Sequence, residues 1–288
     1  LSHTDLAGRD FSGQDLTGAN LTDATLANTN LTGATLRGTN LSRTDLSNRD
    51  FSGQDLTGVT LTEAILTNTN LTGAILRGVH LGKTDLAGRN FSGQNLVGVN
   101  LSDANLLNAD LGNTNLTGAN LLGANLIGAN LAGAVLNNAN LRSAHLVSAN
   151  LSAADLRGAN LTKANLINAK LKGATLKGAN LSYTDLANRN LSGQDLAGTN
   201  FKSANLFNAD LRNTNLTGAN LRGADLMDAD LTGAILRKTH LARNNLSGRN
   251  LSHQDFTGAN MVAINLRDTD LTGTSLQGAE LAEANLSN

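Results

Sequence analysis

The 288-residue sequence has no cysteine and no proline, and its formal net charge is only −1. Without cysteine there are no disulfides, thiolate metal sites or cysteine nucleophiles. The near-zero net charge provides no bulk attraction to nucleic acid or to an anionic membrane. No run approaches the ~20 apolar residues of a membrane span. No signal peptide is visible, which favours the cytoplasm, or the periplasm or thylakoid lumen if a leader was removed.

One short repeat fills the sequence. With Leu1 taken as position one, an apolar residue recurs there every five residues up to Leu286, 58 times without a slip. Neither the helical period of 3.6 nor the strand period of 2 fits this spacing. Units this short must stack to bury anything, so we predict one domain, residues 1–288, with positions one and four facing a narrow interior. Both ends fall within the repeat, and we interpret the chain as a trimmed, processed or excised piece of a longer protein.

A second period of 20 residues lies above the first, because every twentieth residue belongs to a column with its own character. Four units per coil predict a square all-β solenoid of about 14 coils, roughly 65–70 Å long at ~4.8 Å per rung. Position three is mostly Gly or Asn in three columns, which predicts turns with a positive φ at three corners. The fourth column begins His3, Asp23, Arg43. It predicts a different turn that admits side chains.

The units resemble the pentapeptide-repeat family, whose motif A(D/N)LXX appears as Ala119-Asn120-Leu121 and Ala154-Asp155-Leu156. The resemblance covers the whole chain and implies a right-handed quadrilateral β-helix. Many members of that family look cyanobacterial and uncharacterised. A few resemble DNA and inhibit a type II topoisomerase, and others act in regulation or as appendages of larger proteins.

One cassette, R(D/N)(F/L)S(G/H)Q, recurs at separations that are multiples of 20, so its copies share a face. Its arginine and glutamine occupy position four of successive units: Arg9 and Gln14, Arg49 and Gln54, Arg89 and Gln94, Arg189 and Gln194, Arg249 and Gln254. A buried guanidinium needs hydrogen-bond partners, which the glutamine or a backbone carbonyl would supply. We interpret the cassette as structural, with an arginine-lined binding groove as the alternative.

Nothing in the sequence predicts catalysis. The histidines (His3, His80, His145, His240, His253) are too scattered to ligate a metal. Asp and Asn recur at position five by the dozen, which marks them as backbone and ladder partners. A convex solenoid offers no pocket for a nucleophile and its base. We therefore expect no enzyme activity, no cofactor, no metal and no small-molecule substrate.

The best functional signal is an apolar column at the outward position two. We call it the apolar strip, and it comprises Leu107, Ile127, Val147, Ile167, Ala187, Phe207 and Met227. Contiguous exposed apolar surface marks an interface, whereas single surface apolar residues are normal. We predict that the strip binds a protein partner, a flanking domain or a second copy.

Three weaker hypotheses remain. DNA mimicry against a topoisomerase needs a continuous acidic face, but the acidic residues are scattered and 141–180 is net basic. A hydroxyl column (Ser12, Thr32, Ser52, Thr72, Ser92) would suit ice or carbohydrate binding but is interrupted farther on. A basic column (Arg37, Arg77, Arg157, Lys177, Arg237) fits a solvated face better than an acidic partner. No aromatic residues interleave with these cations, which disfavours binding of single-stranded nucleic acid.

Overall fold

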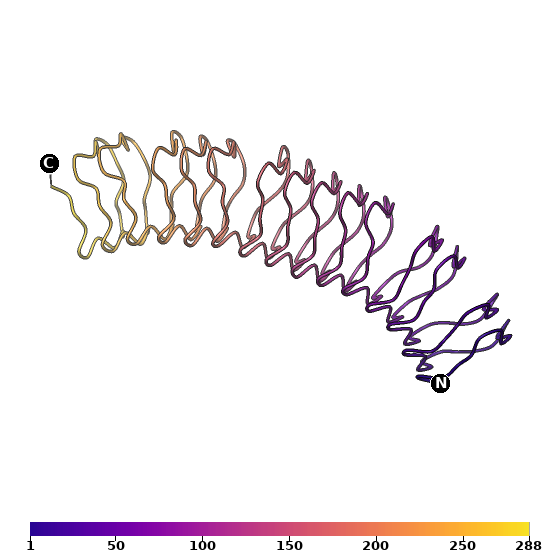
Figure 1. Ribbon diagram of the computed structural model, residues 1–288. Helices are drawn as coiled ribbons and strands as arrows, with labels where there is room; N and C mark the ends of the chain where they lie inside the picture. Colours follow the sequence, from indigo (N-terminus) through magenta and orange to yellow (C-terminus); the bar gives the residue numbers. More distant parts are fainter. Residues whose placement is uncertain (288) are drawn as a thin grey trace.

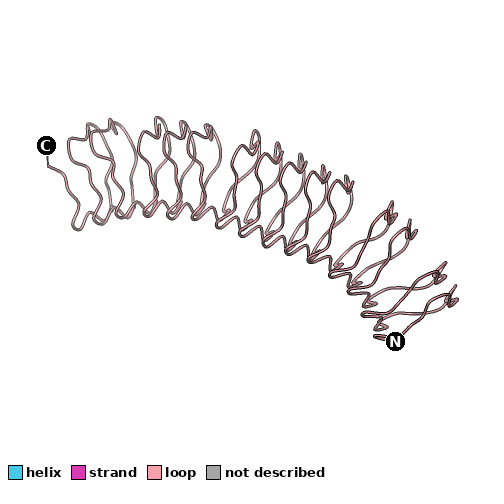
Figure 2. Cartoon of the chain, viewed as in Figure 1, coloured by secondary structure: helices cyan, strands magenta, loops and turns pink. Residues whose placement is uncertain are grey.

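The computed structural model describes residues 1–287, and in it the chain winds into one curved rod (Figure 1). Within these residues there is no helix and no strand longer than a single bridged residue, so the whole path is drawn as turn and loop (Figure 2). Each five-residue unit is a turn at positions two and three followed by one bridged residue at position five. The fold is an all-β solenoid of repeated corners.

Parallel bridges join residues 20 apart, as in Asp5↔Thr25, Asn100↔Asn120 and Asn265↔Asn285. The prediction of four units per coil is confirmed. The N–H of each position-one residue donates to a position-five carbonyl one full turn further along the chain (Leu101 to Asn120, 2.7 Å). The N–H of position five donates back to position four of the preceding coil (Asn105 to Thr84, 2.9 Å). We number the faces by their units, so that residues 1–5 begin the first face and 16–20 the fourth.

The interior is a ladder of leucines with small residues between them. From Leu106 to Leu161 every position-one leucine is fully buried, and so are the alanines at position four from Ala119 to Ala159. Burying one leucine contributes about 1.5–3 kcal/mol. Threonine at position four fits the same narrow space because its hydroxyl donates to a backbone carbonyl, as Thr39 does to Leu16 at 2.8 Å.

The prediction that one corner uses a different turn is wrong. Every position-three residue from His3 to Glu283 has a positive φ, including Asp23 at 54° and Arg43 at 55° on the first face. A left-handed residue with a side chain costs about 1–2 kcal/mol. The turn recovers part of this because the N–H groups of positions three and four both find backbone acceptors, as those of Asp103 and Ala104 do. The repeating geometry therefore overrides residue preference at that corner.

Asn and Asp at position five act on the backbone, as expected. Their Oδ1 accepts the N–H of the residue two positions later, as between Asp10 and Ser12 at 2.9 Å. On the fourth face the amides also stack, with Nδ2 of Asn120 donating to Oδ1 of Asn100 at 3.1 Å and Nδ2 of Asn140 donating to Asn120 at 3.0 Å. The predicted amide ladder is confirmed there.

Stacking is not uniform along the rod. No bridge of the first, second or third face in residues 1–287 crosses the boundaries after residues 40, 80, 180 and 240. The fourth face stays joined at each of them: Asn40↔Thr60, His80↔Asn100, Asn180↔Asn200 and His240↔Asn260. The coils part there on the convex side of the arc, while the concave edge runs on unbroken (Figure 1). The uniform rung spacing assumed for the predicted length therefore does not hold on three faces at these four boundaries.

Candidate functional sites

Four of the five cassette arginines lie at the open boundaries. Arg189 projects back across the gap from the second face, where its Nη1 donates to the Ala169 carbonyl at 2.9 Å and its Nη2 donates to the Leu166 carbonyl. Three more arginines reach the same two acceptors, 20 and 23 residues earlier: Arg49 to Thr29 and Leu26, Arg89 to Thr69 and Leu66, Arg249 to Ala229 and Leu226. The guanidinium thus takes over part of the hydrogen bonding that the backbone ladder provides elsewhere.

Side-chain length explains why the coils part. Thr69 occupies the position of Arg89 one coil earlier, and its short hydroxyl donates to the carbonyl 23 residues back, Leu46, at 2.9 Å. An arginine reaching the equivalent carbonyl is several bonds longer and does not fit the space that Ala or Thr fills. It therefore holds the coils apart. Burial of the guanidinium lowers the pKa of Arg89 and of Arg249.

The cassette glutamines face the same gaps from the third face. The Oε1 atoms of Gln54, Gln94 and Gln194 are buried without a hydrogen-bond partner. Gln254 alone of the four reaches across, with Nε2 donating to the Leu231 carbonyl at 3.1 Å. No hydrogen bond between a cassette arginine and its glutamine occurs within residues 1–287. Of the two partners expected for the guanidinium, the backbone carbonyl is the one it bonds. Arg9 and Gln14 lie exposed on coil 1–20.

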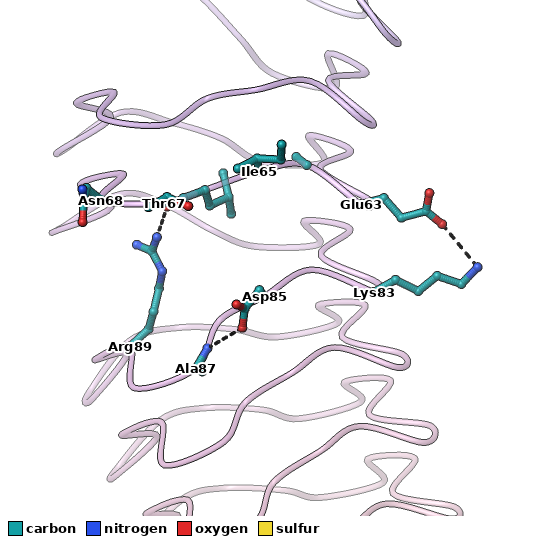
Figure 3. Close-up of a pocket in the computed structure, with 10 residues that line it drawn as sticks. Glu63, Ile65, Thr67, Asn68, Lys83, Asp85, Ala87 and Arg89 are labelled. Carbon is teal, nitrogen blue, oxygen red and sulfur yellow. Dashed lines mark hydrogen bonds and ion pairs between the residues drawn. The ribbon is translucent and has the colours of Figure 1, made fainter.

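Each boundary forms a cleft. The cavities measure about 600 Å³ after residue 40, 650 Å³ after residue 80 and 630 Å³ after residue 240. After residue 180 there are two, about 740 and 330 Å³, and Arg189 lines both. Figure 3 shows the cleft after residue 80, where Arg89 reaches back to the preceding coil and Lys83 pairs with Glu63 at 3.3 Å. The expectation that a convex solenoid offers no pocket is wrong, because a cleft opens at each of the four boundaries where the coils are wedged apart.

The apolar strip lies on the second face, and its members are exposed or half-buried. Ile127, Ile167 and Met227 have exposed fractions of 36%, 48% and 57%. Leu107, Ile127, Val147 and Ile167 follow one another in the unbroken stack 81–180, where the carbonyl of each accepts from the coil before. Beyond the cleft after residue 180 the column resumes with Ala187, Phe207 and Met227. The structure therefore divides the strip into two segments, a division that the sequence does not reveal.

The pentapeptide-repeat profile matches overlapping segments from residues 1–33 to 250–288, so that together they span the chain. The chain belongs to the pentapeptide-repeat family. No curated protein matches it in sequence.

Solved pentapeptide-repeat structures resemble the chain. HetL, a protein involved in heterocyst differentiation regulation from the cyanobacterium Nostoc sp. strain PCC 7120, is 30% identical over 85% of this chain and 88% of its own, with a TM-score of 0.25. A pentapeptide repeat protein from the Arabidopsis thaliana thylakoid lumen is 36% identical over 39% of this chain and 72% of its own, with a TM-score of 0.26. QnrB1, a plasmid-mediated fluoroquinolone resistance protein, is 21% identical over 80% and 90%, with a TM-score of 0.36.

Several members of the basic column on this pentapeptide-repeat chain are paired with nearby carboxylates. In the basic column, Arg37 lies 3.5 Å from Asp55, Lys177 lies 3.0 Å from Asp195, and Arg237 lies 3.5 Å from Asp255. Such exposed pairs contribute little stability, but they neutralise these members of the column. Within residues 1–287 no three His, Asp or Glu side chains come together to hold a metal ion, and no helix is long and apolar enough to cross a membrane.

Proposed function

We propose that this pentapeptide-repeat protein is a non-enzymatic interaction scaffold whose apolar strip binds a protein partner. The observation that carries this proposal is the row Leu107, Ile127, Val147 and Ile167, four apolar side chains at the surface of successive coils in the rigid stack 81–180. A contiguous exposed apolar row of this kind is a feature of interfaces. The ladder fixes the backbone beneath the row, so binding would require little reordering of the scaffold.

Family membership supports the wider parts of this proposal. It favours the right-handed winding and, at 20 residues per coil, the count of about 14 coils expected from the period. HetL is involved in heterocyst differentiation regulation, a role that is compatible with a scaffold.

Two other functions receive less support. The first is topoisomerase inhibition by DNA mimicry, and the 21% identity to QnrB1, a fluoroquinolone resistance protein, does not support it. Here Asn interrupts the position-five carboxylates on the first three faces, and the fourth face has only Glu280 at that position. The hydroxyl column suggested for ice or carbohydrate is crossed by open boundaries between Thr32 and Ser52 and between Thr72 and Ser92, so its members are not evenly spaced.

The double variant Ile127→Asp/Ile167→Asp tests the strip. Both side chains are exposed, so the variant should fold while placing two charges on the apolar row. If the partner is a second copy, light scattering across a concentration series shows a wild-type dimer that the variant loses. If the wild type is monomeric, affinity capture should retain a partner that the variant loses.

The matched control is Leu122→Asp/Arg142→Asp, which adds two carboxylates at exposed position-two sites of the first face in the same stack. It should keep the mass and the partners of the wild type. A strip variant that also keeps both would contradict the proposal.

A further inference from the structure

The cleft after residue 180 differs from the other three at one corner, where Lys170 and Lys172 stand in place of Asn30 and Thr32, Asn70 and Thr72, and Asp230 and Thr232. Its larger cavity, about 740 Å³ on the third-face side of Arg189, is lined by Lys170, Lys172 and Arg189, with Gln194 among the polar groups. None of its lining residues carries a carboxylate. The volume lies in the range of sites for small ligands, about 300–1,000 Å³.

Backbone donors add to this positive potential. In the regular stack the N–H groups of Leu151 and Ala153 donate to the Lys170 and Lys172 carbonyls of the next coil, at 2.8 and 2.9 Å. One coil later, Leu171 and Gly173 occupy the same two positions, and their N–H groups have no backbone acceptor across the open boundary. Adjacent free N–H groups in a concavity bind anions.

Lys170 also removes a local acceptor. At the equivalent corners of the other clefts, position five accepts the N–H of position two: Asn30 from Thr32 (3.0 Å), Asn70 from Thr72 (3.0 Å) and Asp230 from Thr232 (2.9 Å). An ammonium group has no acceptor to offer. The Lys172 N–H is therefore left without that bond, so stability of the turn does not explain Lys170.

The acidic residues nearest the cleft already have partners. Asp185 lines only the smaller cavity, where its Oδ1 accepts from the Ala187 N–H at 3.1 Å and from Nδ2 of Asn205 at 2.9 Å. Asp155, on the coil before, forms an ion pair with Arg157 at 2.5 Å, and the hydrogen bond to Arg157 holds the pKa of Asp155 far below its ordinary value. Asp195, next to Gln194, lies 3.0 Å from Lys177. No carboxylate lines the larger cavity to neutralise Lys170 and Lys172.

We propose that the cleft after residue 180 binds a phosphate-bearing anion. Lys170 and Lys172 bind its charged oxygens as ammonium groups, and the free Leu171 and Gly173 N–H groups donate to the same anion. The guanidinium of Arg189 already bonds two carbonyls but keeps further donors. The buried Oε1 of Gln194 accepts from a ligand hydroxyl.

Isothermal titration of the full chain with inorganic pyrophosphate, in low-salt buffer, tests the site. The wild type should bind one equivalent, and added salt should weaken the binding because exposed charges are screened. Lys170→Asn/Lys172→Thr gives this cleft the Asn70/Thr72 pair and should weaken binding at least tenfold. It also restores the acceptor for the position-two N–H, so the variant should fold at least as well as the wild type.

The reciprocal variant Asn70→Lys/Thr72→Lys transfers the pair to the cleft after residue 80, which has the same arginine and glutamine. It should gain a second equivalent of bound pyrophosphate. The proposal is overturned if the wild type shows no saturable binding, if Lys170→Asn/Lys172→Thr binds as the wild type does, or if the wild type already binds one equivalent per cleft.

Discussion

The third residue of each unit is left-handed whatever its side chain, so glycine and non-glycine residues at this position should respond oppositely to exchange. Ala153 has a φ of 57° and is exposed. Replacing Ala153 with Gly removes a strain of about 1–2 kcal/mol and adds an entropic cost of about 0.5–1 kcal/mol. We expect Ala153→Gly to raise the melting temperature, although glycine normally destabilises regular structure. Thermal denaturation followed by circular dichroism measures it.

Gly118→Ala is the opposite exchange. A Cβ at Gly118 would meet nothing within 4 Å, so only its φ of 65° opposes the substitution. The melting temperature should fall. A fall in both variants would show that corner strain does not limit stability.

Residue preferences alone predict the positive φ of position three on only three of the four faces. The many glycines and asparagines at position three correctly predict left-handed corners on three faces. They mispredict the first face, where Arg43 and Lys83 adopt the same φ near 55–57°. Stacking on the neighbouring coils imposes that conformation, and stacking is a property of the repeat rather than of the residue.

At the scale of one unit, the cassette arginine is the cause of each cleft. Arg89→Thr/Gln94→Ala gives coil 81–100 the pair that coil 61–80 carries, Thr69 and Ala74. We expect the cleft after residue 80 to close and the backbone bonds of three faces to form, each worth about 0.5–1.5 kcal/mol net. The melting temperature should rise and small-angle scattering should show a straighter particle.

Arg89→Ala alone is the informative comparison for that variant. It removes the donor to the Leu66 and Thr69 carbonyls but leaves Gln94 in place. We expect it to destabilise the chain. If Arg89→Thr/Gln94→Ala is destabilised as much and stays curved, the arginine is not what holds the coils apart.

The sequence predicts the positions of the cassettes but not the clefts that they open. The separations of the cassettes place Arg49, Arg89, Arg189 and Arg249 on one face, and a backbone carbonyl was an expected partner. The pattern does not say whether the neighbouring coils absorb the extra volume or separate. That outcome depends on the bridges between coils, which the first, second and third faces give up and the fourth keeps.

At the scale of the whole molecule, the common face of the cassettes explains the curvature. All four wedges open away from the same fourth face, so their bends add in one direction and produce an arc (Figure 1). If the cassettes lay on alternating faces, their bends would cancel and the rod would stay straight. The multiples of 20 that separate them therefore determine the shape of the rod.

Acid should weaken the whole rod, because carboxylates at position five cap the turns. Hydrogen bonds from Ser52 lower the pKa of Asp50, and those from Thr232 lower the pKa of Asp230, from an ordinary value near 3.8. Folded-state values below the unfolded ones mean stability that is present above about pH 4 and lost as the pH falls through the lowered values. The melting temperature should change little between pH 7 and pH 5 and then drop toward pH 2. Asp50→Asn/Asp230→Asn should flatten that drop, because Asn accepts the same bond without titrating, as Asn70 does from Thr72. An equally steep drop in this variant would assign the acid sensitivity to groups other than the turn caps.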